Sequence, residues 1–108
     1  MENNTINELQ KKIHQTAKDH GWWNDDRDIG TILMLIVTEV AEAMEAHREN
    51  KQSSENIPQF SGVEEELADI IIRVLDFAGH KGYDMEKILQ AKMEYNDTRP
   101  YRHGGKIA

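Results

Sequence analysis

The sequence predicts an all-α protein that folds as a single domain over residues 1–108, in the form of a four-helix bundle. Four segments carry apolar residues at the three- and four-residue spacing of a helix, and none alternates apolar with polar residues convincingly enough to predict a strand. Short connectors separate the four segments, which is typical of helical bundles. A chain of 108 residues is long enough to bury one core.

The first helix is expected to begin after Thr5, which forms a capping-box pattern with Glu8, and to end at Gly21. The second helix is expected over about residues 29–49. Nearly every position in its central part is apolar apart from one polar side. That side consists of Thr38, Glu39, Glu42, Glu45 and Glu49.

Ser61 and Glu64 form another capping-box pattern that begins the third helix, which is expected to end near residues 79–82. Asp84 is expected to cap the fourth helix. The buried side of this last helix would consist of Met85, Ile88, Leu89 and Met93. The second and third helices are apolar around more of their circumference than one bundle covers, so we expect a homodimer or homotetramer formed through these central helices.

The composition excludes several classes of protein. The absence of cysteine rules out disulfides and thiolate metal sites, and a formal net charge of −7 argues against general nucleic-acid binding. The N-terminus has no signal-peptide pattern, and the longest apolar run, residues 32–37, is too short to span a membrane. We therefore expect a soluble cytoplasmic protein with no membrane and no nucleic-acid partner.

Two pairs of carboxylates lie within the apolar central helices. Glu39 and Glu42 belong to the second helix, and Glu66 and Asp69 belong to the third. Residues three apart are neighbours on one helix face, and an unpaired buried carboxylate is very costly. A divalent cation held between the two helices would compensate for that cost. The alternative is that these acids form the solvated faces of two amphipathic helices.

The end of the chain carries the main concentration of positive charge. Lys92, Asn96 and Arg99 share one face of the fourth helix and its exit, and the following tail adds Arg102, His103 and Lys106. Such residues are suited to binding phosphate groups. They would equally fit a helix end whose cations complement the macrodipole, followed by a solvated tail.

Two adjacent tryptophans, Trp22 and Trp23, occupy the loop between the first two helices. Tryptophans in such a loop often cover the core or anchor an interface. The functional alternative is a stacking wall for a base or a sugar. The sequence leaves both alternatives open.

The carboxylate pairs resemble the metal motif of a known family. Glu39-x-x-Glu42 followed by Glu66-x-x-Asp69 on two apolar helices looks like the motif of the MazG-like nucleotide pyrophosphohydrolases, within the all-α nucleoside triphosphate pyrophosphatase superfamily. The C-terminal residues 92–104 are similar to the part of the compact MazG-like members that contacts the nucleotide. The resemblance extends from the tryptophan loop to the tail.

The resemblance implies hydrolysis of a nucleoside triphosphate, with a deoxynucleotide favoured, between the α and β phosphates to give a monophosphate and pyrophosphate. Nucleotide-pool cleaning would be consistent with that reaction. Mg²⁺, or Mn²⁺ in its place, would be bound by the carboxylates that also carry the catalysis, namely Glu39, Glu42, Glu66 and Asp69. The substrate would be bound by Lys92, Asn96, Arg99, Arg102, Trp22 and Trp23. Neither the base preference nor the participation of Glu45, Asp76, His103 and Lys106 follows from the sequence.

A rival hypothesis is a non-catalytic helical interaction module whose acidic face pairs with a partner. Arg73 stands at helical spacing from Asp69 and Asp76, and such pairs contribute only ~0.2–0.5 kcal/mol each on a helix surface. Dependence on a divalent metal separates the two hypotheses, because an interaction module has no need of Mg²⁺.

Overall fold

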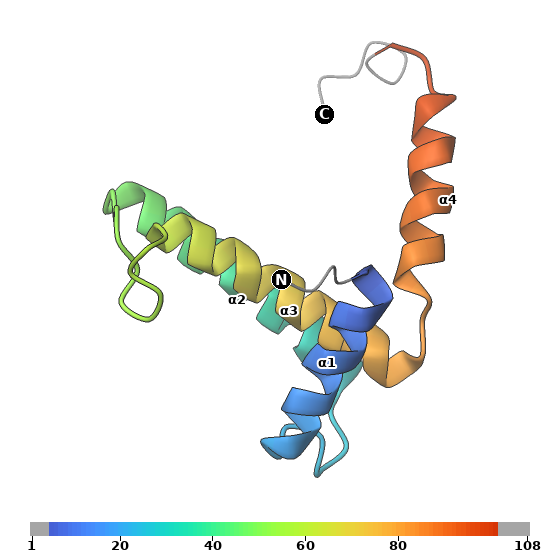
Figure 1. Cartoon of the computed structure of the whole chain (residues 1–108), viewed down its shortest axis with the longest axis horizontal. Helices are drawn as coiled ribbons and strands as arrows, with labels where there is room; N and C mark the ends of the chain where they lie inside the picture. The colour runs from blue at the N-terminus through green and yellow to red at the C-terminus, as the bar shows by residue number, and fades with distance from the viewer. Residues whose placement is uncertain (1–4, 102–108) are drawn as a thin grey trace.

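The computed structural model describes residues 5–101 and is all-helical, as the sequence predicts (Figure 1). The part of the chain that it describes contains no strand. No described helix is long and apolar enough to cross a membrane. The four helices are α1 (Ile6–Asp19), α2 (Ile29–Arg48), α3 (Gly62–Lys81) and α4 (Met85–Asp97).

Local capping signals define the helix ends. Ser61 and Glu64 form the expected reciprocal capping box at the start of α3. Asp28 caps α2 by accepting a hydrogen bond from the backbone N–H of Thr31 at 2.9 Å. Gly21 and Gly82 follow α1 and α3 with φ angles of 86° and 72°, a region in which glycine is favoured.

Helix α3 is the centre of the fold. It runs alongside α2, and α1 packs across it on another side (Figure 1). Helices α1 and α3 approach each other closely at Gly79, where an added Cβ atom would lie only 2.7 Å from Cβ of His14. The buried apolar residues of the described chain come from α2 and α3. They are Ile32, Ala46, Leu75 and Ala78.

The connector between α2 and α3 is fastened to the start of α3. Ser54 is buried, and its backbone N–H donates to the carbonyl of Phe60 at 2.8 Å. Its hydroxyl donates to Glu65, whose other carboxylate oxygen accepts from the side chain of Asn56 at 2.8 Å. This loop therefore forms a fixed wall beside the acidic residues of α3.

Helix α4 projects away from α2 and α3 and contacts the start of α1 (Figure 1). The backbone N–H of Asn7 donates to Glu86 at 2.8 Å across this contact. The expectation that the apolar side of α4 is buried is wrong for the single chain, since none of the other described helices lies alongside its later turns (Figure 1). Met85 is half-buried, but the other three residues of that side, Ile88, Leu89 and Met93, are exposed.

Helices α2 and α3 also expose apolar side chains. One side of α2 presents residues at helical spacing, and α3 adds a second group. On α2 these are Leu33, Met34, Val37, Val40 and Met44, and on α3 they are Leu67, Ile71 and Ile72. A surface of this kind is typical of a helix that packs against another chain.

Candidate metal centre

The paired helices α2 and α3 bring three of the four motif acids together. Each of Glu39, Glu42 and Glu66 offers a carboxylate oxygen, and these oxygens all lie within 4.8 Å of one another. We call these three residues the acid cluster. Asp69 follows Glu66 by three residues on α3 and lies outside the cluster itself.

The acid cluster contains two buried oxygens that have no hydrogen-bond partner. Glu39 is only 8% exposed. Oε2 of Glu39 and Oε2 of Glu66 are both inaccessible to solvent and unpartnered within the described part of the chain. Leaving such oxygens unsatisfied is costly, and oxygen ligands of this type are the ones that Mg²⁺ and Mn²⁺ prefer. The residues present therefore fit a divalent cation.

The carboxyl groups shift one another's pKa in opposite directions. Burial raises the pKa of Glu66 to about 7, with further contributions from the side chain of Glu39 and the charges of Glu42 and Asp69. Burial also acts to raise the pKa of Glu39, but contacts with Arg73 and the neighbouring acids outweigh it, so that pKa lies below its ordinary value. The pKa of Asp69 is raised, first by burial and then by the charges of Glu39 and Glu65.

Arg73 is the counter-ion of the acid cluster. Its Nε donates to Oε1 of Glu39 at 2.8 Å, which connects α3 to α2. The ion pairs in the described chain do not include the pairing of Arg73 with Asp69 or Asp76 that the helical spacing suggested. The reason is geometric, because the guanidinium group reaches across to the facing helix instead of along its own.

Two hollows flank the acids. The α1-side hollow, of about 330 Å³, is lined by Glu39 and Asp69 together with residues of α1 and the tryptophan loop. The loop-side hollow, of about 420 Å³, is lined by Glu42, Glu66 and Asp69, and Glu45 also lines it. Ligands on either side of the cluster would therefore meet carboxylate oxygens.

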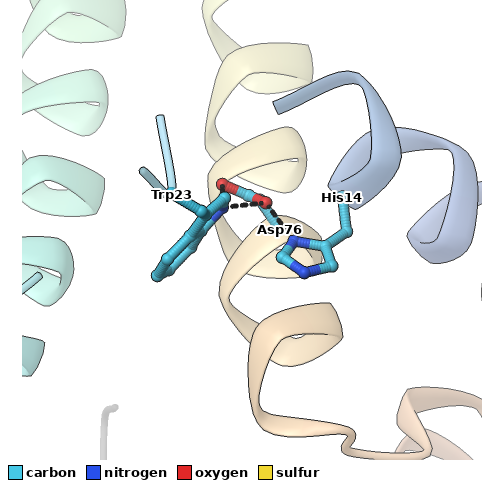
Figure 2. A network of polar contacts seen from close by, with 3 residues as sticks. All are labelled: His14, Trp23 and Asp76. Atoms are coloured by element: carbon cyan, nitrogen blue, oxygen red, sulfur yellow. Dashed lines mark hydrogen bonds and ion pairs between the residues drawn. The ribbon is translucent and has the colours of Figure 1, made fainter. Parts of the chain in front are cut away.

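Asp76 belongs to a separate network and not to the acid cluster (Figure 2). Its carboxylate accepts hydrogen bonds from Nε1 of Trp23 at 2.9 and 3.1 Å and contacts Nδ1 of His14 at 2.8 Å. A carboxylate oxygen accepts hydrogen bonds, so Nδ1 of His14 is the donor in this contact. The network joins α1, the tryptophan loop and α3.

The two tryptophans have different surroundings. Trp23 stacks on His80, with ring centroids 3.9 Å apart, and the guanidinium of Arg27 lies 4.7 Å from the Trp23 ring. Trp22 is 62% exposed and lines the α1-side hollow. Of the two, Trp22 is thus the one that a ligand in this hollow would meet.

The basic residues of α4 are not brought to the acid cluster of the same chain. Lys92 and Asn96 lie in the second half of α4 and Arg99 follows its end, and α4 projects away from α2 and α3 (Figure 1). Lys92 Nζ lies 4.6 Å from the Tyr95 ring centroid, and Arg99 lies 5.9 Å from the same ring. Arg102, His103 and Lys106 fall outside the described residues.

Sequence reasoning missed the cross-helix role of Arg73 and the involvement of His14. A signal existed for the Asp76 network, because the N–H of a covered tryptophan requires an acceptor and Asp76 was a polar residue on a largely apolar helix. No comparable signal assigned Arg73 to Glu39 in preference to Asp69.

No protein-family model, curated protein or solved structure matches this chain. The basis for assigning a function is therefore the pattern of its own residues and the geometry of the acid cluster. Both concern the same pair of helices, α2 and α3.

Proposed function

We propose that this protein is a Mg²⁺-dependent nucleoside triphosphate pyrophosphohydrolase of the MazG-like type. The single observation that carries the proposal is the acid cluster, in which one carboxylate oxygen from each residue lies within 4.8 Å of the other two, and in which Glu39 and Glu66 each have a buried, unpartnered oxygen. The order of the carboxylate pairs, which resembles the MazG-like motif, supplies the reaction type. The products would be a nucleoside monophosphate and pyrophosphate.

Glu39, Glu42 and Glu66 would hold the cation, with Asp69 placed one turn further to join them. Mg²⁺ bound there would neutralise phosphate charge and lower the pKa of an attacking water, and Mn²⁺ would substitute for it. Glu39 or Glu42 would also orient or deprotonate that water. Catalysis of this kind relies on positioning and on electrostatic stabilisation.

The α1-side hollow is the place that best suits the organic part of the substrate. It adjoins Glu39 and Asp69 and is lined on another side by the exposed ring of Trp22. An aromatic face of this kind stacks favourably on a base. A deoxynucleoside triphosphate is the favoured substrate under this proposal.

The exposed apolar sides of α2, α3 and α4 support a homodimer or homotetramer as the working unit. Obligate interfaces of this kind commonly exceed ~2,000 Å² and are hydrophobic. Lys92, Asn96 and Arg99 lie away from the acid cluster of their own chain. In the oligomer they would bind the phosphates of a substrate held by another copy.

Hydrolysis of a panel of nucleoside triphosphates tests the proposal. We expect turnover with Mg²⁺ and none in excess chelator. Glu42→Gln and Glu66→Gln should lose most of the activity while remaining folded. Glu94→Gln is a matched control, since it removes one carboxylate from an exposed site on α4. Equal turnover by Glu42→Gln and Glu94→Gln would exclude the acid cluster as the catalytic centre.

A second candidate is a helical interaction module that uses the acidic face to bind a partner. The pairing of Glu39 with Arg73 favours it, because it demonstrates that an acid of this face accepts a cationic side chain. The two functions differ in their need for metal. Partner binding that persists in excess chelator, together with no turnover of any nucleotide, would support the interaction module.

A further inference from the structure

The α1-side hollow contains two arginine side chains beside the candidate metal centre. Arg27 and Arg73 line it together with three acids, Glu39, Asp69 and Asp76. Asp76 is already engaged by Trp23 and His14, and Glu39 is a member of the acid cluster. The net charge that this hollow presents to a ligand therefore depends on whether its acids are bound to a cation.

Arg73 has hydrogen-bonding capacity to spare. A guanidinium group carries five N–H donors in a rigid, planar fork. Nε of Arg73 is used by Glu39 at 2.8 Å, but its two terminal nitrogens take part in no hydrogen bond with the described residues. The side chain is 34% exposed. The terminal nitrogens are thus available to a ligand immediately next to Glu39.

A cation at the acid cluster would change the balance of charge in this hollow. Without one, three carboxylates outnumber the two guanidinium groups, and Glu39 neutralises Arg73. A divalent cation bound by Glu39 would offset the negative charge of this carboxylate. Arg73 would then lose much of its counter-ion. The hollow would then attract an anion, and the guanidinium fork of Arg73 would supply hydrogen-bond donors to its oxygens beside the acids that would hold the cation.

From this geometry we infer that Arg73 is a substrate-binding residue. With a divalent cation at the acid cluster, its terminal nitrogens bind phosphate oxygens of a phosphorylated ligand whose organic part lies towards Trp22. The inference rests on the proposed function and adds a phosphate-binding residue supplied by the same chain as the acids. It also predicts that phosphate binding requires the cation.

A purely structural role for Arg73 would be confined to its ion pair with Glu39. The substitution Arg73→Lys separates the two roles, because lysine keeps a positive charge near Glu39 but lacks the fork that binds two phosphate oxygens at once. Arg48→Lys is the matched control, since Arg48 is an exposed residue at the end of α2, away from the hollow.

The first test measures binding of inorganic tripolyphosphate by calorimetry, in excess Mg²⁺ and in chelator. We expect binding by the native protein only with Mg²⁺, and an affinity about ten- to a hundredfold lower in Arg73→Lys. The affinity for Mg²⁺ alone should be similar in the two proteins, and Arg48→Lys should bind tripolyphosphate like the native protein. The inference is overturned by native-like tripolyphosphate binding in Arg73→Lys, by equal binding in chelator, or by a matching loss of Mg²⁺ affinity.

The second test uses the unsubstituted protein, so it does not depend on the folding of a variant. Phenylglyoxal modifies accessible arginines, and peptide mass spectrometry measures the extent at each one. Tripolyphosphate with Mg²⁺ should protect Arg73 and leave the modification of Arg48 unchanged. Equal modification of Arg73 with and without tripolyphosphate would contradict the inference.

Failure of this inference differs from failure of the proposed function. If Arg73→Lys hydrolyses a nucleoside triphosphate at the native rate, Arg73 is not a substrate-binding residue, and the proposed pyrophosphohydrolase activity still stands. Protection of Arg73 by Mg²⁺ and tripolyphosphate, in a protein that hydrolyses no nucleotide, would retain the anion site and reject that enzyme.

Discussion

Glu66 should make the affinity of the metal centre depend on pH in the neutral range. Burial, the side chain of Glu39 and the charges of Glu42 and Asp69 raise its pKa to about 7. A carboxyl group must lose its proton to bind a cation, so protons compete with Mg²⁺. With this pKa, Glu66 is ionised in roughly a tenth of the molecules at about pH 6 and in roughly nine tenths at about pH 8. The apparent Mg²⁺ affinity should therefore rise about tenfold over this range, or about 1.4 kcal/mol.

Isothermal titration calorimetry with Mg²⁺ or Mn²⁺ at the two pH values measures this rise. Glu66→Gln should bind more weakly at both values and should lose the pH dependence, because the titrating group is gone. Glu94→Gln, which removes an exposed carboxylate of α4, should keep it. An affinity that is the same at both pH values in the native protein would refute the reasoning, and so would an undiminished rise in Glu66→Gln.

The ionisation of Glu66 also determines how the stability of the metal-free protein depends on pH. The folded-state pKa of Glu66 lies above its ordinary value of 4.5, so folding favours the protonated carboxyl. Its contribution to stability is therefore fully present below about pH 4.5 and is lost as the pH rises through about 7. Asp69, whose pKa is also raised, acts in the same direction, and Glu39, whose pKa is lowered, acts in the opposite one. Saturating Mg²⁺ should restore the stability that is lost when Glu66 ionises.

Three further predictions concern other parts of the molecule. Val40→Glu places a charge on the exposed apolar side of α2 and should reduce the oligomer to smaller species in light scattering. If the native protein is already a stable monomer at low micromolar concentration, the predicted interface does not exist. Asp76→Ala leaves two half-buried donors, Nε1 of Trp23 and Nδ1 of His14, unpaired and should lower the free energy of unfolding by roughly 1–3 kcal/mol in denaturant titrations, whereas Asp97→Ala, at the exposed end of α4, should not. Lys92→Ala and Arg99→Ala should each weaken nucleotide binding by about ten- to a hundredfold without changing metal-induced stabilisation. Native-like nucleotide affinity in both variants would exclude the basic face of α4 from the site.

The helix boundaries could be predicted from the sequence because capping is a local interaction. Ser61 and Glu64 are within one turn of each other, and the glycines at positions 21 and 82 act on the turn that precedes them. The gathering of Glu39, Glu42 and Glu66 was also predictable. Acids three residues apart share one helix face, so two such pairs on apolar helices come together when those two faces meet.

The direction of α4 and the partner of Arg73 were not predictable in the same way. An apolar stripe on α4 indicates that the helix needs a partner but does not say which chain supplies it. Arg73 lies within reach of acids on its own helix and on α2, and only the tertiary packing selects Glu39. The network of His14, Trp23 and Asp76 likewise depends on how α1 crosses α3.

Product analysis in labelled water is the most direct test of the central claim, that the acid cluster supports hydrolysis at the α phosphorus. The protein would be incubated with Mg²⁺ and a deoxynucleoside triphosphate in ¹⁸O-water, and phosphorus NMR with mass spectrometry would follow both products. Attack of water at the α phosphorus breaks the bond to the oxygen that bridges the α and β phosphates. That oxygen leaves with the pyrophosphate.

We expect one pyrophosphate for each monophosphate, no diphosphate intermediate, and the ¹⁸O label in the monophosphate alone. Excess chelator should abolish the reaction, and Glu42→Gln should lose most of it. A nucleoside diphosphate with labelled orthophosphate, label in the pyrophosphate, or undiminished turnover in chelator would contradict the account.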